Sequence, residues 1–174
     1  MIRFLVLLIA TILVVANPVF AQIQIAADFD GDGTEDLAEL VINAQLLSAD
    51  LVITTAAATY RFPEFVYSGG MEGQEASLAL SQEGALQVNS GNRSMGRDRW
   101  DQTLTIVWSE DGFLLAGVTR AWWDTLTPDS DGNCEVDLIT GKGLANGPEG
   151  AREIRLETPA PLLSDWDGAM PEGC

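Results

Sequence analysis

The feature that most constrains the fold is a stretch of alternating residues in the middle of the chain. Apolar side chains occupy every second position of residues 103–108, as Leu104, Ile106 and Trp108. Asp111-Gly112 then supplies a two-residue turn, and residues 113–123 return with similar composition. A period of two puts one side of each strand into a core, so the pattern predicts a β-hairpin.

Other segments carry weaker signals of the same kind. We expect strands at residues 37–42, 50–55, 77–80, 85–88, 135–140 and 153–157. Residues 37–48 also keep helical spacing, so both strand and helix stay open for that segment. Seven or so short strands predict a mainly β chain with a single antiparallel β domain over residues 22–174, arranged as a meander, a sandwich or an open barrel.

The first 21 residues have the composition of a signal peptide. Arg3 precedes an apolar run over residues 4–16 that only Thr11 interrupts, and a small residue, Ala21, ends the segment. The run is shorter than the roughly 18 residues that a membrane span requires. We therefore expect cleavage after Ala21, a periplasmic or secreted protein, and no membrane span after cleavage.

The charge balance is strongly acidic. The chain has 9 Lys and Arg against 26 Asp and Glu, a net charge of −17, and no histidine. Such a surface repels nucleic acid and attracts divalent cations or cationic partners. The missing histidine excludes Ser-His-Asp and Cys-His catalysis and the usual zinc sites. The partner stays unknown, with a cationic protein or a carbohydrate as the options, and we expect no nucleic-acid binding.

An acidic loop near the start of the predicted domain has the register of a calcium site. Carboxylates stand at its positions one, three, five and nine, a glycine (Gly33) at six, and a residue that offers its backbone carbonyl at seven. The predicted ligands are Asp28, Asp30, Asp32, Thr34 and Asp36. Gly33 permits the sharp backbone bend. The alternative is a solvated acidic turn, and we favour the metal.

Residues 28–37 resemble the FG-GAP and VCBS repeat families, which carry Asp-x-Asp-Gly-Asp-Gly-x-x-Asp-Leu at the mouth of a β-strand. The resemblance covers about residues 27–38 and implies that the same five residues hold Ca²⁺. The loop also matches most positions of the EF-hand calcium loop, including a glutamate, Glu39, at position twelve. It differs at position eight, where Glu35 replaces the usual apolar residue. Residues 134–143, together with 96–100 and 123–126, resemble a group of uncharacterised exported bacterial proteins of the FG-GAP type, a resemblance that implies no activity.

A second acidic loop repeats part of this spacing. Its candidate ligands are Asp129, Asp131, Asn133 and Asp137. Position six holds Cys134, where a positive φ would be costly for a residue with a Cβ. A second metal site and a plain turn are both open, and we favour the turn.

Two cysteines, Cys134 and Cys174, are present in this predicted exported chain. The simplest expectation is one disulfide, which would tie the C-terminus back to the domain. A redox-active pair is the alternative, but such cysteines usually lie close together in sequence.

Two functions follow from these observations. The leading hypothesis is a non-enzymatic, exported calcium-binding β-domain in which the metal stabilises the N-terminal loop. The alternative is a carbohydrate-binding module or a glycosidase that uses exposed tryptophans and paired carboxylates.

Three arginines, Arg97, Arg99 and Arg120, stand out in so acidic a chain. We expect them to form ion pairs within the protein, and the alternative is that they bind the carboxylate of a ligand.

Overall fold

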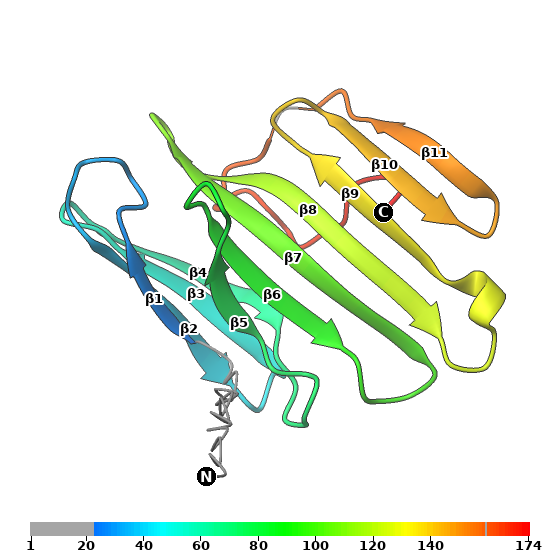
Figure 1. Ribbon diagram of the computed structural model, residues 1–174. Helices are drawn as coiled ribbons and strands as arrows, with labels where there is room; N and C mark the ends of the chain where they lie inside the picture. The colour runs from blue at the N-terminus through cyan, green and yellow to red at the C-terminus, as the bar shows by residue number, and fades with distance from the viewer. Residues whose placement is uncertain (1–22, 159) are drawn as a thin grey trace, which may run out of the picture.

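The computed structural model describes residues 23–158 and 160–174, which form a mainly β structure. The predicted signal peptide lies outside the described residues. The described part of the chain contains no helix that is long and apolar enough to cross a membrane. Its strands form two antiparallel sheets (Figure 1).

The smaller sheet contains the first four strands in chain order. They are β1 (Gln24–Ala27), β2 (Asp36–Asn43), β3 (Ser48–Thr54) and β4 (Thr59–Tyr67), and each pairs antiparallel with the next. Alternate residues of the two central strands are buried, as the period-two pattern requires: Ala38, Leu40, Leu51 and Ile53.

The larger sheet contains the other seven strands, ordered from β5 at one edge to β11 at the other. They are β5 (Ser77–Leu80), β6 (Leu86–Asn92), β7 (Asp98–Ser109), β8 (Gly112–Asp124), β9 (Gly132–Asp137), β10 (Lys142–Gly147) and β11 (Gly150–Arg155). A short 3₁₀ helix, η1 (Pro128–Ser130), connects β8 to β9. Both sheets are meanders, because every strand pairs with its neighbours in sequence.

The two sheets pack on each other over part of their area. Strands β1 and β2 contact β5, and β4 contacts β6. The ring of Tyr60 on β4 lies edge-on to those of Trp108 and Phe113, at centroid distances of 5.8 and 5.2 Å. One hydrophobic cluster includes residues of both sheets. Of the predicted arrangements, the structure is a sandwich of two meanders, and neither sheet closes on itself.

The C-terminal segment (residues 160–174) fastens to the larger sheet. Near its start, Leu163 donates its N–H to the carbonyl of Phe113 at 2.9 Å, and Leu115 donates to the carbonyl of Pro161 at 3.0 Å. At its end, Cys174 forms the predicted disulfide with the buried Cys134 of β9. Figure 1 shows the segment, in orange to red, passing behind β8 and β9.

The structure changes several predicted strand boundaries. Residues 37–48 are strand rather than helix as far as Asn43, whose Oδ1 accepts the N–H groups of Gln45 and Leu46 and so forms the following turn. The central hairpin turns at 110–111 rather than at Asp111-Gly112, because Ser109 pairs with Gly112. The last two predicted strands start earlier than expected, at Gly132 and Gly150.

Three strands, β1, β4 and β10, were not predicted. Strand β4 contains Pro63, and its register against β3 shifts between Phe62 and Val66, so it lacks a clean alternation. Strand β10 carries two glycines, Gly143 and Gly147. A Cβ at Gly143 would lie 2.5 Å from the carbonyl oxygen of Glu135, so the close pairing with β9 requires glycine there.

Candidate metal centre

The acidic loop joins β1 to β2 and is organised by its own carboxylates. The Asp28 side chain accepts the N–H of Gly31 at 2.7 Å and that of Gly33 at 2.9 Å. Both glycines have positive φ angles, 78° and 87°, which other residues adopt only at a cost of about 1–2 kcal/mol. The Asp-x-Asp-Gly-Asp-Gly sequence therefore folds locally into a tight turn that wraps around the Asp28 carboxylate.

Asp36 is the loop's most unusual residue. It is the first residue of β2, and only 2% of its surface is exposed. Its Oδ2 accepts the N–H of Phe29 at 2.8 Å and that of Asp30 at 3.3 Å. Its Oδ1 is also buried and has no hydrogen-bond partner among the described residues. A buried carboxylate oxygen without a partner is costly, which points to a ligand at this position.

Three of the predicted ligands come together at the Asp36 carboxylate. Asp28, Asp30 and Asp36 each offer a carboxylate oxygen, and these atoms all lie within 4.8 Å of one another. Their exposure decreases from the exposed Asp28 to the half-buried Asp30 and the buried Asp36. The group can hold a metal ion, which would offset the mutual repulsion of three carboxylates at such short range.

The other two predicted ligands are not part of this group. The Asp32 side chain is exposed, and its Oδ1 accepts the N–H of Thr34 at 2.6 Å. Thr34 is exposed as well, and its role as a carbonyl ligand stays a prediction.

The second acidic loop does not gather its four candidate ligands. Asp129 lies in η1, while Asp131 accepts the N–H of Asp124 at 3.1 Å. Asn133 accepts a hydrogen bond from Asn146 at 3.1 Å, and Asp137, at the far end of β9, accepts the N–H of Thr140 at 3.0 Å. This last bond lowers the pKa of the Asp137 carboxyl. Asp131, Asn133 and Asp137 thus have separate hydrogen-bond partners, and the choice between a turn and a second metal site stays a prediction.

The arginines that the sequence singled out have three different environments. Arg97 pairs with Asp124, which raises the pKa of the guanidinium. Arg99 donates to the carbonyl oxygens of Arg93 at 2.8 Å and Gly96 at 3.3 Å. Arg120 lies over the ring of Trp100, 4.9 Å from its centroid, and burial lowers the pKa of its guanidinium. Only Arg97 thus follows the default of an internal ion pair within the described residues.

The five tryptophans are all half-buried, so none is a fully exposed platform. One of them, Trp166, lines a cavity together with Glu157 and Glu172. Sequence reasoning missed this combination. The three residues meet only because residues 160–174 fold back over the larger sheet. No local sequence pattern predicts this course of the chain.

No protein family, curated protein or solved structure matches the chain. The resemblance to FG-GAP and VCBS repeats, which covers about residues 27–38, therefore stays a prediction from the sequence.

Proposed function

We propose that this chain is an exported calcium-binding β-domain without enzymatic activity, in which the cation fixes the loop between β1 and β2. The observation that carries the proposal is the buried Asp36 carboxylate, whose Oδ1 has no hydrogen-bond partner among the described residues. It belongs to one group with Asp28 and Asp30. A cation would give this oxygen a partner and would compensate the three charges.

The donor set favours calcium over other metals. All three converging side chains offer oxygen, the ligand atom of hard cations. The chain has no histidine, and the described residues contain no free cysteine, so the usual ligands of zinc and copper are missing. Calcium accepts six to eight oxygens in irregular geometry, whereas magnesium requires a near-ideal octahedron. A tight loop with carboxylates at different depths suits the more tolerant ion.

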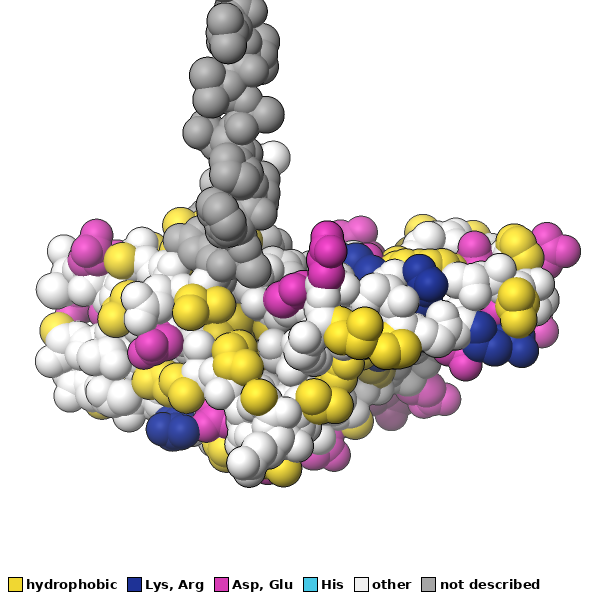
Figure 2. All heavy atoms as spheres, turned by 90° about the horizontal axis from the view of Figure 1, so that it is seen from below, with side chains coloured by type: hydrophobic (Ala, Val, Ile, Leu, Met, Phe, Trp, Pro, Cys, Tyr) yellow, Lys and Arg dark blue, Asp and Glu magenta, His cyan; other side chains and the backbone are white. Residues whose placement is uncertain are grey.

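The site's position suggests a structural role for the metal. Asp28 directly follows β1 and Asp36 begins β2, so a shared cation would link the two strands of this hairpin at its loop end. The proposal does not depend on the overall acidity of the chain. On the face seen in Figure 2, carboxylate side chains are scattered among hydrophobic and basic ones rather than gathered in one patch.

Thermal unfolding with and without calcium tests the proposal. Saturating calcium, at about a hundred times Kd, adds about 2.7 kcal/mol to the free energy of unfolding, which corresponds to a rise of roughly 5–10 °C in the melting temperature of a domain of this size. Asp30→Asn should abolish the rise. Glu35→Gln removes one charge from an exposed residue of the same loop and should keep it. An unchanged wild-type melting temperature at millimolar calcium would refute the proposal.

Export is tested separately by the mass of the protein that reaches the periplasm or the medium. We expect a chain that begins at Gln22, because cleavage is predicted after Ala21. An intact N-terminus on protein recovered only from the cytoplasm would contradict this part of the proposal.

A further inference from the structure

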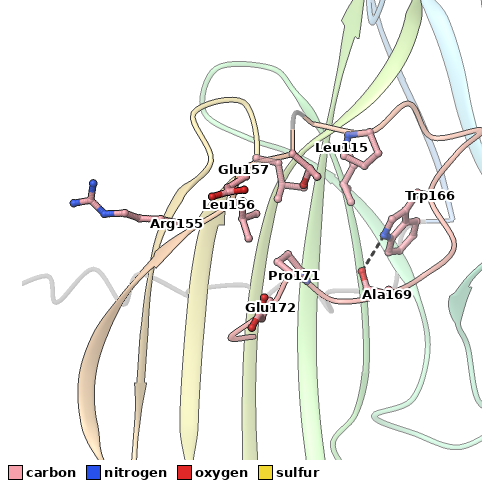
Figure 3. A pocket seen from close by; sticks show the side chains of 11 residues that line it. Leu115, Arg155, Leu156, Glu157, Trp166, Ala169, Pro171 and Glu172 are labelled. Atoms are coloured by element: carbon pink, nitrogen blue, oxygen red, sulfur yellow. Dashed lines mark hydrogen bonds between the residues drawn. The ribbon is translucent and has the colours of Figure 1, made fainter.

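A cavity of about 530 Å³ lies between the larger sheet and the C-terminal segment (Figure 3). It shares no residue with the acidic loop. Its volume falls within the range of about 300–1,000 Å³ that is typical of small-molecule sites. Its lining comes from β8, from the end of β11 and the residues that follow it, from Leu138 after β9, and from the C-terminal segment itself.

The cavity wall combines apolar and polar surface in similar amounts. Leu115, Leu138 and Leu156 contribute aliphatic side chains from the sheet and its loops, and Pro161 and Pro171 contribute the rings of the covering segment. Leu115 and Leu138 are buried, at 1% and 5% exposure. An apolar ligand body placed against these side chains would lose part of its contact with water, which favours its binding.

The indole of Trp166 forms one side of the cavity. Its Nε1–H donates to the carbonyl of Ala169 at 3.2 Å, so this donor is already used (Figure 3). Its ring also packs edge-on against Phe65 at a centroid distance of 5.0 Å. Trp166 is thus held in place and offers the cavity an aromatic surface rather than a hydrogen bond.

The charged side chains at the cavity leave it negative. Glu157 and Glu172 line it, both are exposed, and neither forms an ion pair within the described residues. Arg155 also borders it, but Figure 3 shows its side chain pointing away. Its guanidinium pairs with Glu153 at 2.8 Å, an interaction that raises the pKa of Arg155. Arg152 donates to the carbonyl of Gly173, next to Glu172, at 2.8 Å, but it forms no ion pair with either cavity carboxylate within the described residues.

We propose that this cavity binds a small organic cation with an apolar body, such as a hydrophobic amine. The aliphatic wall would take the body, and the ammonium group would lie within reach of Glu157 and Glu172. The indole of Trp166 adds a surface that attracts cations. A sugar would find fewer partners here, because among the described lining residues Thr158 alone adds a hydroxyl or amide side chain to the two carboxylates.

The test uses the indole N–H signals of the ¹⁵N-labelled protein, with the signal of Trp166 assigned through Trp166→Phe. Phenethylamine is titrated to about 10 mM, a range that detects millimolar Kd values. 2-Phenylethanol serves as the neutral analogue, and cellobiose as the sugar. The variant Glu157→Gln/Glu172→Gln is compared with Glu72→Gln/Glu110→Gln, which changes the net charge equally at exposed turn residues outside the cavity.

We expect saturable movement of the Trp166 signal with phenethylamine and binding of 2-phenylethanol that is weaker by about tenfold or more, a difference of about 1.4 kcal/mol. The cavity double variant should lose this discrimination, and the control double variant should keep it. The proposal is overturned if phenethylamine leaves the Trp166 signal in place, if the neutral analogue binds as tightly, or if cellobiose moves the signal at lower concentration.

Discussion

The buried carboxylate of Asp36 accepts the backbone N–H of Phe29, seven residues earlier, at 2.8 Å. This bond closes the acidic loop at its base and places Phe29, itself 9% exposed, at the edge of the core. One oxygen of Asp36 thus has a structural role, while the other lacks a partner among the described residues. The folding and the metal binding of the loop can therefore be separated by substitution.

Asp36→Asn should separate these two roles. The amide oxygen can still accept the Phe29 N–H, but the variant loses the charge and one carboxylate oxygen. We expect its free energy of unfolding in chelator to stay close to that of the wild type or to rise, because a repelling charge is removed. Asp36→Ala also loses the acceptor and should be less stable than Asp36→Asn by about 1–3 kcal/mol. Urea unfolding in EDTA measures both. Equal stabilities of the two variants would show that the Phe29 bond contributes nothing.

The second acidic loop should not bind calcium. Asp131 already accepts the N–H of Asp124, and its predicted co-ligands make separate hydrogen bonds. Asp131→Asn should therefore leave the calcium affinity unchanged, as competition with a chromophoric chelator would show. A loss of calcium on this substitution would mean that the second loop is a metal site.

The disulfide should contribute strongly to stability. Cys134 and Cys174 are separated by 40 residues, and closing a loop of this length stabilises the folded state by roughly 4 kcal/mol in the chain-entropy estimate. The double variant Cys134→Ser/Cys174→Ser should unfold at correspondingly lower urea concentration. It should also free the end of the segment that covers the cavity. A double variant as stable as the wild type would show that the contacts of Leu163 and Trp166 hold this segment without the disulfide.

Asp50 should make the domain sensitive to acid. The pKa of its carboxyl is lowered, chiefly by the N–H of Glu64 at 2.8 Å and further by Arg61. A group whose pKa is lower in the folded state stabilises the fold above its ordinary pKa, and this stabilisation is lost as the pH falls through the folded-state value. The free energy of unfolding should therefore decline below about pH 4. Asp50→Asn should be less stable than the wild type at pH 7, with a gap that narrows in acid. A gap independent of pH would contradict this assignment.

The backbone at Glu64 carries strain that glycine should relieve. Glu64 has a φ of 48°, in the left-handed region, and lies close to the register shift between β3 and β4. Glu64→Gly keeps the N–H that Asp50 accepts, so we expect a rise of about 0.5–1 kcal/mol in the free energy of unfolding. Chemical denaturation at pH 7 measures it, and a clear loss of stability would show that the side chain has a role of its own.

The sequence predicted those features that depend on local chemistry. Gly33 adopts the positive φ that its position in the loop requires, and the central hairpin follows from the alternation around Leu104. The predicted disulfide is also present. Strand β10 escaped prediction in part because Gly143 is required by close contact with β9, which is not a local property.

The candidate sites likewise include features that the local sequence predicts and features that depend on the tertiary fold. Asp28, Asp30 and Asp36 meet within one short loop, so their spacing was informative. The burial of Asp36 depends on packing against the core and was not visible in the sequence. Likewise, Glu157 and Glu172 face a cavity only because the C-terminal segment returns to β8 and β9.

Isothermal titration of the purified protein with calcium tests the central claim most directly. The account predicts one calcium ion bound per chain, because the described residues contain one converging acidic group. It also predicts that Asp36→Asn binds none while remaining folded in chelator. Absence of binding by the wild type, or equal binding by wild type and Asp36→Asn, would contradict the account.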